Sequence, residues 1–376
     1  MMQASNGIED LKNDAIALLK ELIATPSFSR EEEQTAGLIT RFLGLRRIEH
    51  ARIANNVYAF NGGFDPSKPT VLLNSHHDTV KPATGWVRDP FQANEEDGRL
   101  YGLGSNDAGA SLVALIAAFL HFHDREGLPW NLALAATAEE EVSGPNGVEY
   151  LLNSTHFNEA LQGSRILGAV VGEPTGMQMA VAEMGLMVVD AMAAGRSGHA
   201  ARNEGDNAIL HAMEDIRWVH THRFGKVSDL LGPNKATVTV IETENKAHNV
   251  VPDRCRFTVD VRVNDTYTFE EVLAEMQANM RSTLKPRSTR LRPTRIADDH
   301  PLVRAGLSMG RTSYGSPTTS DKALMPFPAL KMGPGDSARS HTPDEYILLS
   351  ELREAVGLYI GLLEKAMDLD ASTTAR

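Results

Sequence analysis

The segment Val71-Leu72-Leu73-Asn74-Ser75-His76-His77-Asp78-Thr79-Val80 is the starting point for predicting the fold. An apolar run of this length predicts a buried strand in a parallel sheet, and such sheets bind ligands beyond the carboxyl ends of their strands. His76 and Asp78 are two positions apart, so in an extended chain they point to the same side. One can therefore hold a metal while the other steadies it. Two surface histidines in a loop are the alternative for this segment alone.

The composition is typical of a soluble globular protein. The 376 residues suit two domains, and 42% are hydrophobic and 23% charged. A formal net charge of -12, without a basic patch, argues against nucleic acid as a partner. The single cysteine, Cys255, permits no internal disulfide and is expected in the core. Because we find no signal pattern and no run long enough to span a membrane, we expect a cytoplasmic protein without membrane contact.

Further apolar runs also end in residues that bind cations. The run 130–137 leads into Glu139-Glu140-Glu141, the run 166–171 leads to Glu173, and the run 329–332 leads to a loop with His341. Adjacent carboxylates at the end of a buried strand are costly unless a cation or a shared proton compensates them. If these strands are parallel, their carboxyl ends meet at one edge of the sheet.

Asp107 stands at the start of a helix predicted over 111–123, which is apolar nearly all round and should be buried. An aspartate at this position is typical of a helix N-cap. Its place beside the strand ends also predicts convergence with them. The residues expected at the shared edge are His76, Asp107, Glu141, Glu173 and His341.

A region with a different order of predicted strands and helices lies between the two parts of this first domain. Strands over 184–193, 236–242, 250–263 and 290–296, with helices over 207–222 and 269–284, give the order β-α-β-β-α-β. That order is typical of a ferredoxin-like sandwich. We therefore predict an α/β protein with a mostly parallel sheet, formed by residues 1–179 and 295–376, and an inserted α+β domain over 180–294.

Histidine and carboxylate ligands suit zinc and, less selectively, cobalt or manganese. A carboxylate can bridge a pair of ions about 3.5 to 4 Å apart, and such a pair polarises a carbonyl and lowers the pKa of water. A nearby carboxylate must then take the proton from water and return it to the leaving amine. Glu140 and Glu141 supply a ligand and a base, although spacing alone does not say which is which.

Several motifs together resemble the aminoacylase/carboxypeptidase family of dinuclear zinc metallohydrolases, in order and over nearly the whole chain. This family includes acetylornithine deacetylase, succinyl-diaminopimelate desuccinylase and glutamate carboxypeptidases. Asn74 to Pro82, Gly102 to Ala110 and Glu139 to Gly144 are most similar to N-acetylornithine and N-succinylornithine deacetylases. The motifs are Ser75-His76-His77-Asp78-Thr79-Val80, Tyr101-Gly102-Leu103-Gly104-Ser105-Asn106-Asp107, Thr137-Ala138-Glu139-Glu140-Glu141, Val171-Gly172-Glu173-Pro174-Thr175 and Gly333-Pro334-Gly335-Asp336 through His341.

The resemblance implies a role for each matching residue. Asp78 would orient His76, and Glu140 would be the general base. Glu139 replaces the aspartate common at its position, and His77 fills a variable position and is not expected to be a ligand. The implied zinc ligands are His76, Asp107 and Glu173 for one ion, with Asp107 bridging to a second ion held by Glu141 and His341.

For the inserted region the resemblance implies a lid and dimerisation domain, and hence a homodimer. His199, in Gly195-Arg196-Ser197-Gly198-His199-Ala200-Ala201, would stabilise the developing oxyanion, often in the partner's site; such donors contribute about 3 kcal/mol. Without the resemblance, His199 is a loop residue that caps a turn. Asn249, Arg262 and Thr319 are candidate substrate contacts, and Arg262 equally suits a structural ion pair.

The expected function is metal-dependent hydrolysis of the amide bond of a small N-acyl amino acid, with N-acetylornithine as the substrate, in arginine synthesis. A desuccinylase or a dipeptidase with the same machinery is the enzymatic alternative. A metal- or peptide-binding protein without catalysis is the other alternative, although Glu140 and Asp107 are both present. A serine or cysteine hydrolase has little support, because Cys255 lies in a predicted strand and no nucleophile elbow stands out.

Overall fold

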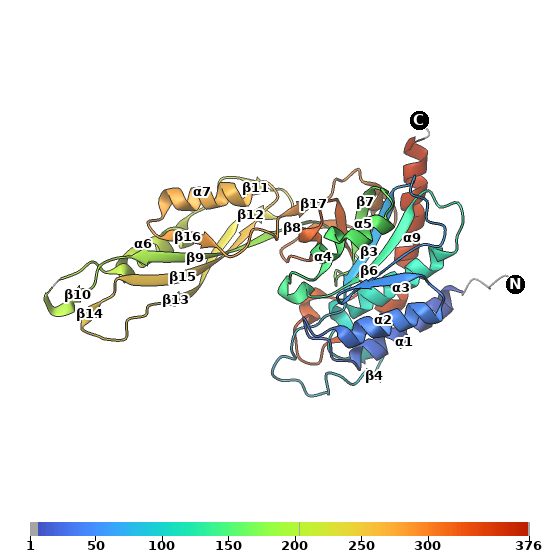
Figure 1. The fold of residues 1–376 in the computed structure, drawn as a ribbon, viewed down its shortest axis with the longest axis horizontal. Coiled ribbons are helices and arrows are strands. Elements are labelled where there is room, and N and C mark those ends of the chain that lie inside the picture. Colours follow the sequence, from blue (N-terminus) through green and yellow to red (C-terminus); the bar gives the residue numbers. More distant parts are fainter. Residues whose placement is uncertain (1–6, 203, 375–376) are drawn as a thin grey trace. The chain divides into compact units, whose positions relative to one another are not determined.

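The computed structural model describes residues 7–202 and 204–374, which form two compact units (Figure 1). The first unit comprises the described residues up to Val181, then Ile296–Tyr314, and the described residues from Ser320 onward. The second unit comprises Ala182–Arg295 and Gly315–Thr319.

A mixed sheet forms the centre of the first unit, in the order β1-β2-β6-β3-β7-β19-β8. Its middle strands β6, β3, β7 and β19 are parallel, whereas β1, β2 and β8 are antiparallel to their neighbours. Every residue of β3 and β6 is buried, as expected for strands covered on both faces. The strands are β1 (His50–Ile53), β2 (Asn56–Phe60), β3 (Thr70–His76), β6 (Asn131–Thr137), β7 (Ile166–Val171), β8 (Met179–Glu183) and β19 (Ala329–Lys331).

Helices cover both faces of this sheet. α3 packs against α1, α9 and the sheet, while α4 and α5 bury their apolar residues against the opposite face. Contrary to the prediction that no run is long enough to span a membrane, the stretch Ser105–His123 is long and apolar enough to do so. Of its apolar 18-residue window, 83% is buried inside the fold, and α3 within it belongs to the core. The helices are α1 (Ile8–Ile23), α2 (Glu33–Leu45), α3 (Ala110–His123), α4 (Val148–Asn153), α5 (Thr155–Ala160), α8 (Pro301–Ser308) and α9 (Leu349–Thr374).

Smaller strands extend the first unit. A short antiparallel sheet in the order β20-β5-β4 ties the segment before α9 to the segment before Asp107. Another short strand, β18, pairs with β8 and continues into the second unit. These strands are β4 (Asn94–Glu96), β5 (Arg99–Tyr101), β18 (Ser313–Ser316) and β20 (Tyr346–Leu348).

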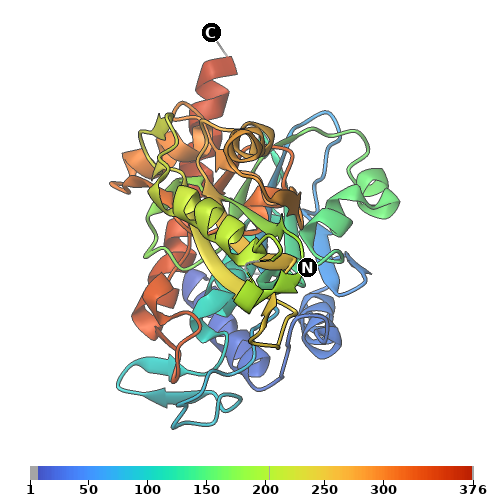
Figure 2. The same cartoon turned by 90° about the vertical axis from the view of Figure 1, so that its left-hand side faces the viewer.

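The second unit is a ferredoxin-like sandwich whose antiparallel sheet has the order β13-β15-β9-β16. Helices α6 and α7 pack on the same apolar cluster of this sheet (Figure 2), and Cys255 lies within that cluster, as predicted. The main elements are β9 (Gly185–Ala194), α6 (Ala208–Thr221), β13 (Lys235–Glu242), β15 (Arg254–Val263), α7 (Phe269–Asn279) and β16 (Thr283–Pro286). The short strands are β10 (Gly198–His199), β11 (Val227–Ser228), β12 (Gly232–Pro233), β14 (Val250–Val251) and β17 (Thr294–Arg295).

The last part of the sandwich differs from the prediction. The helix predicted over 269–284 ends at Asn279, because the buried carboxylate of Asp215 accepts the backbone N–H groups of Arg281 and Ser282 and turns the chain. The last strand of the sandwich is therefore β16, whose first two residues fall within the predicted helix. The strand predicted over 290–296 is reduced to β17, which pairs with the end of β8.

Residues 315–319 also differ from the predicted boundaries, because they join the second unit although the sequence beyond 294 was assigned to the first. The backbone N–H of Met184 donates to the carbonyl of Ser316, and the Thr319 hydroxyl donates to the carbonyl of Met184. These contacts attach the segment to the start of the inserted unit.

Candidate metal centre

The carboxyl ends of the central parallel strands lie in register. His76 ends β3 opposite Thr137, the last residue of β6, and Asn74 pairs with Val171, the last residue of β7. The loops that follow these strands therefore begin at the same edge of the sheet. They carry His76, Glu140, Glu141 and Glu173 there, as the sequence predicts for parallel strands.

Two groups of potential metal ligands share Asp107. The ligand atoms of His76, Asp107 and Glu173 lie within 4.8 Å of one another, and so do those of Asp107, Glu141 and His341. Asp107 Oδ1 is 3.4 Å from His76 Nε2, and Asp107 Oδ2 is 3.6 Å from His341 Nε2. The two oxygens of one carboxylate thus face different groups, which is the geometry of a bridging ligand.

The donor set and its spacing fit a divalent metal. Tetrahedral ligands about 2.0 to 2.2 Å from zinc lie roughly 3.3 to 3.6 Å apart. The distance from His76 Nε2 to Glu173 Oε1 is 3.7 Å, close to that range and too long for a hydrogen bond. Buried His76 Nε2 has no hydrogen-bond partner among the described residues. A nitrogen without a hydrogen-bond partner that faces the carboxylates of Asp107 and Glu173 fits a cation bound by all three side chains.

The charges at the site favour a cation as well. Burial and the neighbouring Asp107 carboxylate raise the pKa of Glu173 to about 8. Burial and Glu173 raise the pKa of Glu140 well above its ordinary value, and burial raises that of Glu141. Without added positive charge, the protein can keep these carboxylates together only by protonating some of them. Divalent cations would remove that conflict.

Asp78 contacts His76 through both its main chain and its carboxylate. His76 Nδ1 lies 3.0 Å from the backbone carbonyl oxygen of Asp78, whereas its distance to the Asp78 carboxylate is 3.4 Å. The carbonyl can only accept, so Nδ1 carries the proton and Nε2 is free to bind metal. The shorter of the two contacts, that of the main-chain carbonyl, orients His76.

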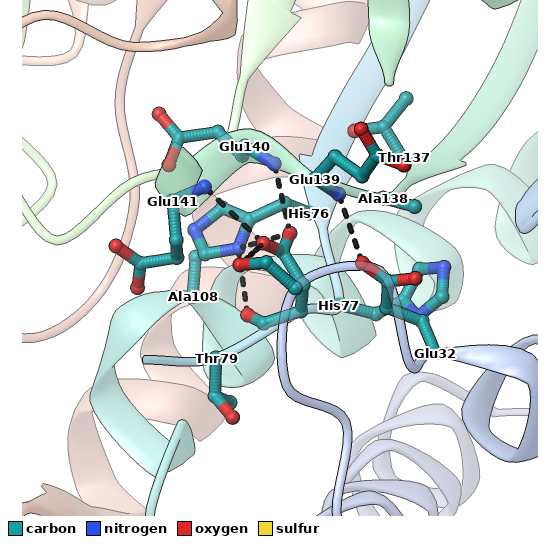
Figure 3. A network of polar contacts seen from close by, with 12 residues as sticks. Glu32, His76, His77, Thr79, Ala108, Thr137, Ala138, Glu139, Glu140 and Glu141 are labelled. Atoms are coloured by element: carbon teal, nitrogen blue, oxygen red, sulfur yellow. Dashed lines mark hydrogen bonds and ion pairs between the residues drawn. The ribbon is translucent and has the colours of Figure 1, made fainter. Parts of the chain in front are cut away.

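The Asp78 carboxylate instead organises the loop after β6. Its Oδ1 accepts the backbone N–H of Glu140 at 3.0 Å, and its Oδ2 accepts the backbone N–H of Glu141 at 3.2 Å (Figure 3). The Ser29 hydroxyl donates to the same carboxylate at 2.7 Å. Figure 3 shows the side chains of Glu140 and Glu141 extending to the side of the His76 ring. Asp78 thereby links the position of the ligand loop to that of β3.

Glu32 supports this loop from the other side and was missed in the sequence, where Glu31-Glu32-Glu33 suits a helix start. Its carboxylate is fully buried and accepts the backbone N–H of Glu139 at 3.2 Å. Glu139, which has a positive φ of 57°, accepts from the side-chain amide of Asn146. Glu139 therefore has a structural role in this loop. The position of Glu32 in an acidic run gave no signal of burial.

His77 is buried and faces away from the ligands. Its Nδ1 lies 2.9 Å from the Thr35 hydroxyl, and its Nε2 lies 2.9 Å from the carbonyl of Asn55. Burial lowers the pKa of His77 to about 4, so the ring is neutral and structural. This arrangement agrees with its exclusion from the predicted ligand set.

The predicted substrate residues lie in the second unit. Pairing of β10 with β14 brings His199 and Asn249 together, since the N–H of Ala200 donates to the carbonyl of Asn249. His199 Nδ1 accepts the N–H of Ala201, which leaves Nε2 protonated and able to donate. Arg262 forms an ion pair with Asp260 at 2.8 Å, and the Thr319 hydroxyl donates to the backbone carbonyl of Met184. Arg262 therefore has the structural partner that was one of its two predicted roles.

Comparisons with known proteins agree with this geometry. The sequence profile of peptidase family M20/M25/M40 matches residues 72–365. The chain is 30% identical to succinyl-diaminopimelate desuccinylase of Cereibacter sphaeroides over 268 residues, covering 68% of this chain and 69% of that protein. It is 28% identical to the enzyme of the same name from Rhodospirillum centenum over 94% of this chain and 97% of that protein.

A solved structure shares the fold. The YXEP protein of Bacillus subtilis, described as a dinuclear metal-binding peptidase, superimposes with a TM-score of 0.70 at 16% sequence identity. The match covers 96% of this chain and 99% of that protein. It includes the inserted domain as well as the central sheet.

Proposed function

Because the chain belongs to peptidase family M20/M25/M40, we propose that it removes a succinyl group from the amino group of an amino acid. The chain is a metal-dependent hydrolase of amide bonds. The acyl group and the amino acid are the parts that we propose. The observation that carries the metal-dependent hydrolysis is the pair of ligand groups that share Asp107, and the similarity to succinyl-diaminopimelate desuccinylases supports the acyl group.

The residues of this site would act in a defined order. Divalent metal ions, when bound, polarise the amide carbonyl and lower the pKa of water. Glu140 takes a proton from the attacking water as the oxygen forms a bond to the carbonyl carbon. It then gives that proton to the amine nitrogen as the carbon–nitrogen bond breaks. The products are a carboxylate and a free amine.

The environment of Glu140 suits this exchange of a proton. Burial and the neighbouring Glu173 raise its pKa well above the ordinary value. A general base works best when its pKa lies near the working pH. The backbone bond from Glu140 to Asp78 fixes the start of the side chain. We assign oxyanion stabilisation to His199, whose Nε2 can donate.

The succinyl group has more support than the acetyl group. Both curated relatives described above are succinyl-diaminopimelate desuccinylases, whereas acetylornithine has only the similarity of short motifs around His76, Asp107 and Glu140. The expectation of acetylornithine deacetylation in arginine synthesis therefore gives way to the desuccinylase alternative. Zinc is the proposed metal, with cobalt or manganese as substitutes.

A substrate panel tests this proposal. Purified protein with added Zn²⁺ is assayed on N-succinyl-diaminopimelate, N-succinylornithine, N-acetylornithine and a set of dipeptides. We expect the highest kcat/KM for a succinyl compound. Faster turnover of the acetyl compound or of a dipeptide would overturn the acyl assignment. No turnover of any amide by the metal-loaded protein would favour a binding protein.

We also propose a homodimer formed through the second unit. Strand β13 lies at the edge of the antiparallel sheet, and its side chains Val240 and Ile241 are about half exposed. Leu210 and Met213 of α6 are exposed to a similar degree. An unpaired edge strand with apolar side chains readily pairs with another chain. A second copy of this chain is the proposed partner, and a cytoplasmic location remains our expectation.

A further inference from the structure

Glu345 is a buried carboxylate that the ligand set does not include. It is 2% exposed and lies four positions after His341, just before β20. Its Oε1 accepts the backbone N–H groups of Asn106 at 2.8 Å and of Asp107 at 2.9 Å. Its Oε2 accepts the backbone N–H of Gly104 at 3.2 Å. The Glu345 side chain thus binds the backbone on both sides of Ser105, including the N–H of Asp107, whose carboxylate is shared by the two ligand groups.

The backbone of the same segment reinforces this contact. The carbonyl oxygen of Glu345 accepts the N–H of Gly102 at 3.0 Å. Gly104 has a positive φ of 74°, a conformation that glycine adopts freely and that lets its N–H donate to the carboxylate. The loop before Asp107 therefore takes its shape around Glu345.

Asn106 makes a second connection between the two segments. Its side-chain amide donates to the carbonyl of Asp336 at 3.1 Å, and its side-chain oxygen accepts the N–H of Asp336 at 3.0 Å. The segment 336–345, which carries His341, is therefore bound at both ends to the loop that carries Asp107. The position of His341 therefore depends on the position of Asp107.

We propose that Glu345 is the positioning residue that holds Asp107 between the two metal positions. Burying a carboxylate near Asp107 is costly, and the three N–H bonds offset this cost only if both oxygens accept. Because Asp107 faces both ligand groups, a shift of its main chain changes both at once. Outer residues that orient metal ligands typically contribute 10- to 100-fold in metal affinity. This inference rests on the proposed function, since it assumes that the cluster binds metal.

The test is the Zn²⁺ affinity of Glu345→Gln, measured in the full-length protein by competition with a chromophoric chelator. A glutamine side chain has one oxygen in place of two, so its NH2 group must face at least one of the backbone N–H groups. We expect both dissociation constants to rise by about 10- to 100-fold. The absorption spectrum of the Co²⁺-loaded variant should also change, because the coordination geometry is altered. Glu345→Asp, which keeps two oxygens, should recover part of the affinity.

Asp215→Asn is a matched control, since Asp215 is also buried and accepts two backbone N–H groups, but in the second unit. It should lower the melting temperature and leave both Zn²⁺ affinities unchanged. Wild-type affinities and an unchanged Co²⁺ spectrum in Glu345→Gln would overturn the proposal, as would weakening at one metal position alone. If Glu345→Gln does not fold, Glu345→Asp decides: wild-type affinity in that variant would contradict the proposal. These measurements need no substrate, so their failure is distinct from failure of the desuccinylase assignment.

Discussion

The carboxylate of Asp78 accepts the backbone N–H of Glu140, with 3.0 Å between oxygen and nitrogen. Asp78 follows β3 and Glu140 follows β6, so the bond joins the ends of neighbouring parallel strands. The same residue orients His76 through its carbonyl oxygen. The proposed metal ligand His76 and the proposed base Glu140 are therefore both held by Asp78, but by different atoms of it. That separation allows the two roles to be distinguished by mutation.

Asp78→Asn should reduce catalysis more than metal binding. The backbone carbonyl that orients His76 remains, while the amide group of asparagine cannot accept the N–H groups of both Glu140 and Glu141. A buried donor left unpaired costs about 1 to 3 kcal/mol of unfolding free energy. We expect metal content near that of the wild type and kcat lowered by about 10- to 100-fold, measured by mass spectrometry of bound metal and steady-state kinetics. Loss of metal with retained kcat per bound metal would contradict this division of roles.

Glu140→Gln should abolish most activity without removing the metals. Glutamine has a similar shape but cannot take a proton, and general base catalysis contributes about 10²- to 10⁴-fold in rate. We expect kcat to fall by this amount with unchanged metal content and melting temperature. Glu364→Gln, a surface change at a residue paired with Arg125, is the control and should keep full activity. Near-normal turnover in Glu140→Gln would rule out the assigned base.

His341→Ala should remove one metal and leave the other. His341 belongs to the group with Asp107 and Glu141, and its side chain is about half exposed, so its loss opens only that position. We expect about one metal per chain after dialysis, against two in the wild type. His76→Ala provides the comparison, because it should lower occupancy of the group that contains Glu173. Equal metal content in His341→Ala and wild type would argue against His341 as a ligand.

Removal of metal should make stability fall as pH rises from 6 to 8. Burial and Asp107 raise the pKa of both Glu173 and Glu345 to about 8, and the hydrogen bond to Glu141 raises that of His341 to about 9. Each group then binds more protons in the folded chain than in the unfolded chain across this interval, so folding weakens with increasing pH. The melting temperature of chelator-treated protein should drop by several degrees.

Addition of Zn²⁺ should flatten this pH dependence, because bound cations compensate the carboxylates in their ionised state. The measurement is calorimetry of the metal-free and reloaded protein at matched ionic strength. A metal-free protein that is more stable at pH 8 than at pH 6 would show that the carboxylates are not crowded as described.

Ile241→Glu should dissociate the proposed dimer. A charge on the exposed edge strand β13 opposes pairing with a second copy, while the fold of the unit is maintained by its buried face. We expect the mass from light scattering to fall from that of a dimer to that of a monomer, with an unchanged circular dichroism spectrum. Val87→Glu, at an exposed position of the first unit, should leave the dimer intact. A monomeric wild-type protein would exclude the dimer outright.

The sequence predicted the central strands well because their signals are local. The run before His76 begins with the apolar residues Val71 to Leu73, and it is fully buried in the structure, as is the run before Glu139. The short strands β1, β4 and β5 escaped prediction, since their stability comes from pairing rather than from an apolar pattern. For the same reason the predicted helix extends to residue 284, into the start of β16, because the real end of α7 depends on Asp215, far away in the sequence.

The sequence by itself determined the fold class and the chemical types of the ligands. Each proposed ligand follows an apolar run or stands at the start of an apolar helix, and the parallel strands bring the ends of those runs to one edge. Only the tertiary structure decided how the ligands are held. The carbonyl of Asp78 orients His76, and the carboxylates of Asp78, Glu32 and Glu345 bind backbone N–H groups of the ligand loops. These supports join segments distant in sequence through main-chain atoms, which every residue carries and no motif reveals.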